Sequence, residues 1–348
     1  MCRQMAVLSR ALQFLRRIAG STAGTVSVSA TDMLGECPRC GRCSDASVRE
    51  CPIDGSPIKR SSSMPLILDG KYRFERLIGR GGMGSVYRAR DLTGDRQVAI
   101  KVIRPELIRD AAVHERLWKE AQMLARLHHP SIVAVYDYGT LEDRSPYLVM
   151  ELVKGVDLRH ELVSEGRLEP ARACRILSAI CGAMAAAHDE GVLHCDLKPE
   201  NVLLPDEGVE AKVLDFGVAQ AIGAGTGARS RTDPGSRFAA ATVEEPIIGT
   251  PAYMAPEQLR GDPPDARTDV FSLGVIAYEM LVGDLPFGAG SVGEVVLAQA
   301  RGVPLDRVET LPASLRRAVK EALALDADRR PPSPQALAYL IGAATGAL

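Results

Sequence analysis

The alternation of apolar and polar residues changes character along the chain. KYRFERLI (71–78) and SVYRAR (85–90) alternate, and QVAIKVI (97–103) is almost continuously apolar, so the pattern predicts three strands. Helical periodicity follows near residues 106–128 and 170–190, and the remainder of the chain is mostly helical in pattern. A small β-rich part followed by a larger α-rich part predicts an α+β fold with two lobes.

Two segments lack this order. Residues 1–32 begin with arginines among apolar residues and continue as a Ser/Thr/Gly-rich linker. A basic amphipathic helix on a membrane surface is one interpretation, and a flexible tail or an early start codon, with Met33 as the true start, is the favoured one. Residues 221–246 are rich in Gly, Ala, Ser, Thr and Arg without periodicity, which predicts a flexible insert.

Composition narrows the class of protein. Of the 348 residues, 46% are hydrophobic and 25% charged, and the net charge is −2, which gives no reason to expect nucleic acid as a partner. No apolar run reaches the ~18–20 residues that span a bilayer. We therefore expect a cytoplasmic protein without a membrane span.

Two patterns point to phosphate chemistry. Gly79, Gly81 and Gly84 have the spacing G-x-G-x-x-G, and the residues after them predict a strand, whereas dinucleotide-binding folds place a helix there. Glycines let backbone amides approach phosphate oxygens closely, so a hairpin over phosphates is favoured. Lys101 lies in an apolar strand and needs an acidic partner. Glu120 shares a helix face with apolar residues and is preferred over Glu115 as this partner.

The order of these motifs resembles a known family. The Gly-rich hairpin, VAIK (98–101), HCDLKPEN (194–201) and DFG (215–217) succeed one another as in the bacterial eukaryotic-like Ser/Thr protein kinases. The resemblance covers about residues 72–343 and implies a bilobal kinase fold. It places the N-lobe at 72–150 and the C-lobe at 154–343.

The resemblance also implies the roles of single residues. Asp196 would accept or orient the proton of the substrate hydroxyl, and Lys198 would neutralise charge on the transferred phosphoryl group. Lys101 and Glu120 would form the ion pair of the active state. Asn201 and Asp215 would hold Mg²⁺ or Mn²⁺. The expected ATP site consists of Ile78, Gly79, Arg80, Gly81, Gly82, Gly84, Val86, Ala99, Lys101, Met150, Glu151, Val153 and Leu203.

Further expected contacts are structural. An apolar stack of Leu124, Val135, His194 and Phe216 would link the lobes, with Asp269 as its anchor, and Glu257 would pair with Arg330.

The segments DLKPEN (196–201) and GTPAYMAPE (249–257), the second of which contains Thr250, are similar to segments of enzymes that phosphorylate Ser and Thr in proteins. The resemblance implies an ATP-dependent Ser/Thr protein kinase that acts in signalling and autophosphorylates; a nucleotide-binding pseudokinase scaffold is the alternative.

One residue departs from the family pattern. Cys195 stands where most relatives have an arginine that grips a phosphorylated activation loop, so this mode of regulation is in doubt. A small filler is favoured over an oxidant sensor, because the adjacent carboxylate raises a thiol pKa. The segment from Asp215 to Glu257 is long for this family. The hydroxyl residues in its middle are equally consistent with autophosphorylation sites and with a spacer; they are Thr226, Ser230, Thr232, Ser236 and Thr242.

A separate cysteine module is predicted at residues 33–60. CPRCG (37–41) and CPIDG (51–55) are near copies that are similar to zinc-ribbon knuckles. Structural zinc takes four tetrahedral ligands. Cys37, Cys40 and Cys51 are expected ligands; Asp54 is preferred as the fourth because it completes the repeat, and Cys43 is the alternative. The metal would supply the folding energy of so small a module, through which a partner could dock.

Overall fold

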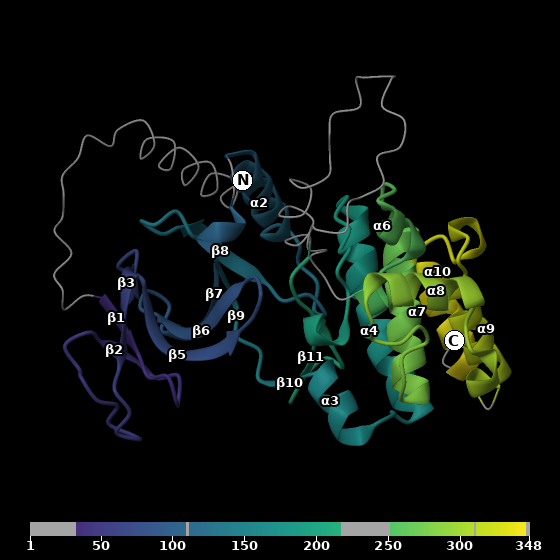
Figure 1. Ribbon diagram of the computed structural model, residues 1–348, viewed down its shortest axis with the longest axis horizontal. Helices are drawn as coiled ribbons and strands as arrows, with labels where there is room; N and C mark the ends of the chain where they lie inside the picture. Colours follow the sequence, from purple (N-terminus) through teal and green to yellow (C-terminus); the bar gives the residue numbers. More distant parts are fainter. Residues whose placement is uncertain (1–32, 109–110, 217–250, 310, 346–348) are drawn as a thin grey trace. The chain divides into compact units, whose positions relative to one another are not determined.

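A computed structural model of the chain describes residues 33–108, 111–216, 251–309 and 311–345 (Figure 1). The chain divides into two compact units, Met1–Arg76 and Leu77–Leu348. The boundary falls inside strand β5 (Tyr72–Arg80), so one continuous strand belongs to both. The predictions for residues 1–32 and 221–246 lie outside the described residues.

The first unit contains a three-stranded antiparallel sheet. Strands β1 (Met33–Glu36), β2 (Cys43–Asp45) and β3 (Lys59–Pro65) are ordered β2-β1-β3. The short strand β4 (Ile67–Leu68) then pairs with the start of β5. Few residues form the core of this unit, chief among them Leu34, Leu68, Tyr72 and Phe74, each at most 2% exposed.

The second unit begins with a sheet built from the end of β5 followed by β6, β7, β9 and β8 in that order. The later strands are β6 (Gly84–Asp91), β7 (Arg96–Ile103), β8 (Val135–Thr140) and β9 (Pro146–Glu151). Strand β7 is central and pairs Lys101 with Val86 on one side and with Leu148 on the other. This position explains the continuous apolar run of β7. Helix η1 (Pro105–Leu107) and helix α2 (Ala111–Leu124) follow it.

The rest of the second unit is mainly helical. Its elements are β10 (Gly155–Asp157), α3 (Leu158–Glu165), α4 (Pro170–Asp189), η2 (Pro199–Asn201), β11 (Val202–Pro205), β12 (Lys212–Val213), η3 (Pro251–Tyr253), α6 (Pro256–Arg260), α7 (Ala266–Val282), α8 (Val292–Arg301), η4 (Leu305–Val308), α9 (Ala313–Ala322), η5 (Ala327–Arg329) and α10 (Pro334–Thr345). Among the helices that the structure describes, none has the length and apolarity that crossing a bilayer requires.

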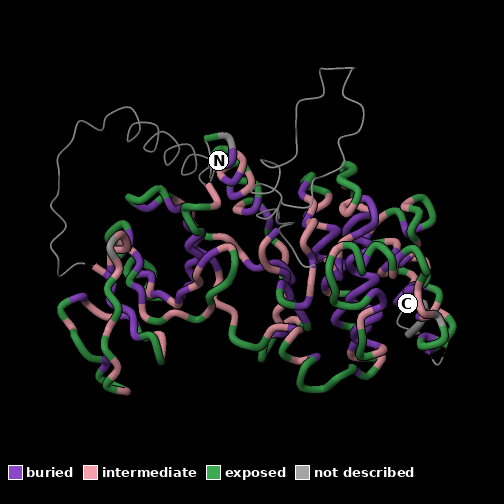
Figure 2. The backbone as a smooth tube through the Cα atoms, viewed as in Figure 1, coloured by how far each residue is buried: buried purple, intermediate pink, exposed green. Residues whose placement is uncertain are grey.

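Helix α7 forms the centre of this helical part. Every residue from Thr268 to Leu281 is buried, and helices α4, α9 and α10 pack against it (Figure 2). The Asp265 carboxylate caps its first turn by accepting from Arg267 N at 2.7 Å. A helix that is buried on all sides is enclosed by protein, so α7 provides a base for the loops that contact it.

A buried ion pair joins two distant segments of the helical part. Arg330 donates to both carboxylate oxygens of Glu257, from Nη1 at 2.7 Å and from Nη2 at 2.9 Å. The Arg330 side chain is fully buried, and burial raises the pKa of Glu257 while the bond to Arg330 lowers it, with a net fall. The expected pairing of these residues is thus present, and so are the three predicted strands and the helix at 170–189.

Candidate active site

The loop that contains Asp196 is held by a buried carboxylate. Asp269, on α7, is fully buried and accepts from His194 N at 2.9 Å and from Cys195 N at 2.8 Å. His188 Nε2 lies 2.8 Å from the same carboxylate. Cys195 has a φ of 58°, a left-handed conformation that is costly for a residue with a side chain and persists only where the surroundings impose it. The expected anchoring by Asp269 is therefore present in the geometry.

Three side chains predicted to act together are close in this loop. Lys198 Nζ lies 2.8 Å from Asp196 Oδ2. Asn201 Nδ2 donates to the backbone oxygen of Asp196 at 2.8 Å, and Asn201 is buried. The loop brings a carboxylate, an ammonium group and an amide together, which is the donor set that positions a hydroxyl and a phosphoryl group.

Lys101 and Asp215 meet across the site. Lys101 Nζ lies 2.7 Å from Asp215 Oδ2; Lys101 is buried and Asp215 is partly buried. Burial would raise the pKa of Asp215, but the neighbouring Lys101 ammonium lowers it to a net value below the ordinary one. Asp215 has a φ of 59°, so its backbone is also held in the left-handed region. Gly217 of the DFG motif lies outside the described residues.

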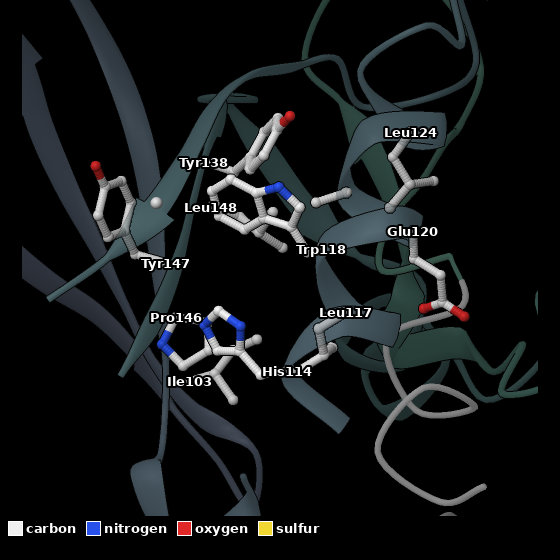
Figure 3. Close-up of a pocket in the computed structure, with 12 residues that line it drawn as sticks. Ile103, His114, Leu117, Trp118, Glu120, Leu124, Tyr138, Pro146, Tyr147 and Leu148 are labelled. Carbon is white, nitrogen blue, oxygen red and sulfur yellow. The ribbon is translucent and has the colours of Figure 1, made fainter. Parts of the chain in front are cut away.

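The expected pair between Lys101 and Glu120 is not formed in this structure. Within the described part of the chain, Glu120 Oε2 is buried without a hydrogen-bond partner, while Lys101 is engaged by Asp215. Figure 3 shows the Glu120 carboxylate directed away from the strands that carry Tyr138 and Leu148. On the other side of α2, Trp118 stacks edge-on against Tyr138, with ring centroids 4.4 Å apart. The face of the helix was predicted correctly as apolar, since Leu117 and Leu124 are buried, but periodicity does not specify where the Glu120 carboxylate points.

The residues expected around the adenine of ATP gather in one apolar cluster. Ala99 and Met150 belong to its buried part, and Val86, Val153 and Leu203 pack against it. At the hairpin, Gly81 N donates to Gly84 O at 2.9 Å. A Cβ at Gly84 would lie 2.0 Å from the backbone oxygen of Val102, so only glycine fits there. The other expected residues, Ile78, Gly79, Arg80 and Gly82, lie at the end of β5 and in the following turn, and Glu151 ends β9.

The loop that contains Asp196, referred to below as the catalytic loop, contributes His194 to the predicted apolar stack. The rings of His194 and Phe216 are 4.9 Å apart, and His194 Nε2 lies 2.9 Å from Leu214 O. Burial and the nearby carboxylates raise the pKa of the Cys195 thiol. The thiol form is therefore favoured, in agreement with the interpretation of Cys195 as a filler and not as a reactive thiolate.

Sequence reasoning missed two sets of contacts. Gln258 Nε2 donates to Cys195 O at 2.8 Å and so ties α6 to the catalytic loop. Arg159 binds Glu279 at 2.6 Å and Glu200 at 2.9 Å, and it also contacts the Tyr253 hydroxyl. Gln258 directly follows the APE motif (255–257) in the sequence, but nothing in a single sequence indicates which loop its side-chain amide contacts.

The comparison with known proteins agrees with this geometry. Residues 72–340, more than three quarters of the chain, match the family described as protein kinase domain. The chain belongs to the protein kinase family. The Ser/Thr-protein kinase PknB of Mycobacterium tuberculosis is 40% identical over 272 residues, 76% of this chain. The Ser/Thr-protein kinase pkn2 of Myxococcus xanthus is 38% identical over 291 residues, 81% of this chain.

Solved structures show the same kinase fold. The kinase domain of M. tuberculosis PknI aligns with a TM-score of 0.63 at 24% identity, over 80% of this chain and 97% of that one. The curated kinases are longer proteins. This kinase chain spans 41% of the length of PknB and 33% of the length of pkn2.

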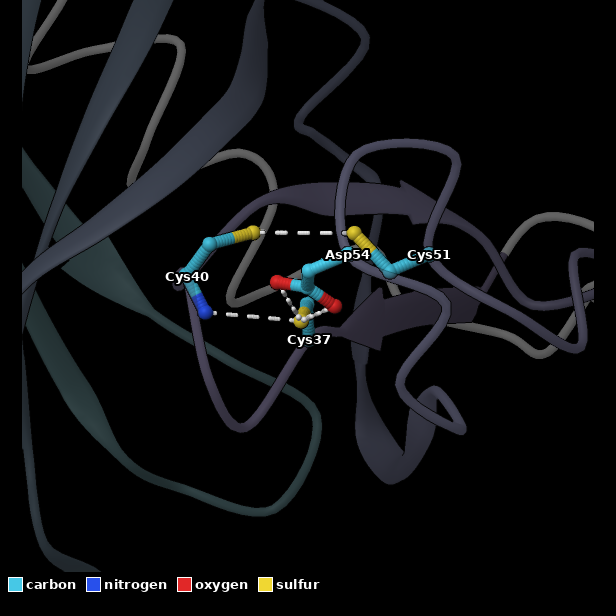
Figure 4. Close-up of side chains that lie close together, drawn as sticks. All are labelled: Cys37, Cys40, Cys51 and Asp54. Atoms are coloured by element: carbon cyan, nitrogen blue, oxygen red, sulfur yellow. Dashed lines mark hydrogen bonds between the residues drawn. The ribbon is translucent and has the colours of Figure 1, made fainter.

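Four candidate metal ligands meet in the first unit of the chain. One ligand atom each of Cys37, Cys40, Cys51 and Asp54 lies within 4.8 Å of the others (Figure 4). Cys40 Sγ and Cys51 Sγ are 3.6 Å apart, and the Asp54 oxygens lie 3.4 and 3.5 Å from Cys37 Sγ. The carboxylate of Asp54 accepts from Ser56 N, which lowers its pKa. Cys43 is not part of this group; its Sγ lies 3.7 Å from Gly41 O.

The two CPxxG segments have the same backbone structure. Cys37 N donates to Arg42 O at 2.9 Å, and Cys51 N donates to Ser56 O at 2.8 Å. In each segment the terminal glycine N donates to the first cysteine O at 2.9 Å, with φ values of 73° at Gly41 and 70° at Gly55. The repeat in the sequence is therefore also a repeat of two turns that direct their ligand side chains to one point.

The unpaired carboxyl of Glu120 generates a prediction about pH. Burial raises the pKa of Glu120 to about 8, so the folded chain retains a proton that the unfolded chain loses near pH 4.5. The free energy of unfolding should then decrease as the pH rises from about 5 to 8. Glu120→Gln removes this contribution. From pH 6 to pH 8.5 we expect the melting temperature of the wild type to fall by about 2–4 °C more than that of the variant.

The control for this prediction is Glu115→Gln on the same helix. The Glu115 side chain is exposed and paired with Lys119, which lowers its pKa, so it does not titrate in this range. Melting temperatures that change equally with pH in the wild type and in Glu120→Gln would show that Glu120 does not retain the proton.

Proposed function

We propose that the chain is a Ser/Thr protein kinase that transfers the γ-phosphoryl group of Mg·ATP to Ser and Thr hydroxyls of proteins. The observation that carries this proposal is the convergence of Asp196, Lys198 and Asn201 on one anchored loop, with Lys101 and Asp215 beside it. Each group required for phosphoryl transfer is present, and the transition state needs mainly positioning and neutralisation of charge.

Each of these side chains has a defined task. Asp196 orients the substrate hydroxyl and accepts its proton, and Lys198, at 2.8 Å from Asp196, faces the negative charge of the transferred group. Asn201 and Asp215 offer an amide oxygen and a carboxylate, the oxygen donors that Mg²⁺ or Mn²⁺ prefers. The metal, when bound, supplies a positive charge that clamps the phosphates.

The state of Lys101 indicates what must change before turnover. Its ammonium is bonded to Asp215, whose carboxylate is also the expected metal ligand. Glu120 Oε2 has no hydrogen-bond partner among the residues that the structure describes. We propose that Lys101 exchanges Asp215 for Glu120 when nucleotide and metal bind, because this single exchange satisfies the orphaned carboxylate and releases Asp215. It requires a rotation or shift of α2.

Protein substrates with Ser or Thr are supported by the relatives. PknB and pkn2 are named Ser/Thr-protein kinases, and this chain shares about two fifths of its aligned residues with each of them. Signalling, autophosphorylation at the hydroxyl residues within 223–242, and a cytoplasmic location stay predictions.

The kinase proposal is tested by ³²P transfer from Mg·[γ-³²P]ATP to the chain itself and to a generic basic protein. We expect label on Ser and Thr, and losses of about 10²–10⁴-fold in Asp196→Asn, since that is the contribution of a positioned acid or base. Asp215→Asn should lose transfer through loss of a metal ligand. Asp206→Asn, an exposed aspartate shortly after the loop, serves as the matched control and should retain activity.

Two outcomes would contradict the proposal. Label that persists in Asp196→Asn and Asp215→Asn would come from another enzyme. Nucleotide binding without any transfer would favour the pseudokinase scaffold.

We also propose that Cys37, Cys40, Cys51 and Asp54 bind a structural zinc ion, in a zinc-ribbon-like module. The proposal is supported by the four ligand atoms within 4.8 Å and by the two matching turns. Three thiolates and one carboxylate form a donor set that suits tetrahedral Zn²⁺. Docking of a partner protein on this module stays a prediction.

The metal content of the purified chain tests the zinc site and its fourth ligand. We expect one zinc per chain by native mass spectrometry. Asp54→Asn should weaken zinc binding at least about 10–100-fold, the loss seen even for outer-shell residues. Cys43→Ala, the control, should retain the metal. The reverse result would assign Cys43 as the ligand, and absence of zinc in a folded wild-type chain would contradict the site.

A further inference from the structure

We propose that Arg76 is a positioning residue that ties the zinc-bound turn to strand β5, so that zinc occupancy controls the affinity of the kinase for nucleotide. This inference rests on the proposed zinc site and on nucleotide binding, and it does not require phosphoryl transfer.

The tie is made by a side chain and by the backbone. Arg76 Nε donates to Cys40 O at 2.9 Å. Arg42 and Arg76 also form an isolated antiparallel bridge, so the backbone of the first turn pairs with β5 at this one position. Both contacts are made to the turn of residues 37–42. This turn carries the proposed zinc ligands Cys37 and Cys40, and it is closed by the hydrogen bond from Cys37 N to Arg42 O.

Zinc is required to keep this turn in place. Within residues 37–42, Cys37 is fully buried, and it is itself a proposed ligand, so the turn has little apolar core of its own. A segment of this size does not fold without metal or another staple. Loss of zinc should therefore release the Cys40 carbonyl, and with it the acceptor of Arg76.

The position of Arg76 in β5 explains why nucleotide binding should respond. The first half of β5 is held by the buried side chains of Tyr72 and Phe74, each 1% exposed. From residue 75 to residue 80 no side chain of the strand is buried. The tie at Arg76 is therefore one of the contacts that hold the second half of β5 in place of a buried side chain. This half leads within three residues to Gly79, the first glycine of the phosphate-binding hairpin.

A single charged hydrogen bond at the surface has a limited effect. We expect loss of the tie to weaken nucleotide binding about three- to tenfold, the range that one such bond accounts for. The effect should appear in the Kd and KM for ATP, while kcat at saturating ATP should change less than about twofold, because uniform binding is lost and the catalytic loop is untouched.

The test measures the Kd of Mg·AMP-PNP by calorimetry, with zinc-loaded chain and with chain stripped by a zinc chelator. Stripping should raise the Kd of the wild type about three- to tenfold. Arg76→Ala should have the raised Kd while still zinc-loaded, and stripping should add nothing further, since coupled changes are not additive. Arg76→Lys should recover part of the affinity, because an ammonium donates to the same carbonyl.

The matched control is Arg73→Ala, the loss of the same side chain from the same strand. Arg73 is exposed and makes no side-chain hydrogen bond within the part of the chain that the structure describes. It should behave as the wild type, with and without zinc.

Three results would overturn the inference. The first is a Kd that does not change on stripping, the second is independent and multiplicative effects of stripping and Arg76→Ala, and the third is a chain that binds no zinc. A chain that binds zinc and nucleotide with the expected coupling but transfers no phosphoryl group would overturn the kinase activity alone.

Discussion

A single buried carboxylate fixes the geometry on which the catalytic groups depend. Asp269 has no exposed surface, and burying a charge is costly unless hydrogen bonds compensate it. The bonds from His194 N and Cys195 N provide this compensation and hold Cys195 at a φ of 58°. The strain at Cys195 and the charge at Asp269 are thus stabilised by the same contacts, directly before Asp196 in the chain.

From this anchor, a series of short bonds reaches the other side of the site. Asn201 donates to Asp196 O, and Leu214 N donates to Asn201 O at 2.8 Å. Asp215, the next residue, then meets Lys101 on the central strand β7. The groups proposed to orient the hydroxyl and those proposed to hold the metal are therefore linked by one series of hydrogen bonds. In the exchange proposed above, α2 moves so that Glu120 reaches Lys101.

The sequence predicted those features that depend on local pattern. The strands around QVAIKVI, the buried helix α4 and the catalytic loop follow from periodicity and motif, and the pairing of Glu257 with Arg330 followed from family resemblance. The grouping of Asp54 with three cysteines was predicted from the repeat of CPxxG, and the structure brings these four residues together. The repeat was informative because two like turns present their ligands alike.

The features that the sequence did not predict depend on tertiary packing. Lys101 binds Asp215 and not Glu120, and on the other side of α2 Trp118 packs on Tyr138. Helical periodicity does not specify this orientation of α2. The contacts of Gln258 with Cys195 and of Arg159 with Glu279 join residues more than sixty positions apart. The tie between Arg76 and Cys40 joins two predicted modules and carries no signal in either motif.

The most direct measurement is the turnover number of Asp269→Asn at saturating Mg·ATP, together with its nucleotide Kd and melting curve. Asparagine has nearly the same size as aspartate, but one of its two polar groups is an amide N–H₂ donor. This donor would face the backbone N–H of His194 or Cys195, so the loop should shift. We expect kcat to fall about 100-fold, as for a misplacement of about 1 Å, with nucleotide binding retained in a folded chain. A folded variant with the wild-type kcat would contradict the conclusion that Asp269 positions the catalytic loop.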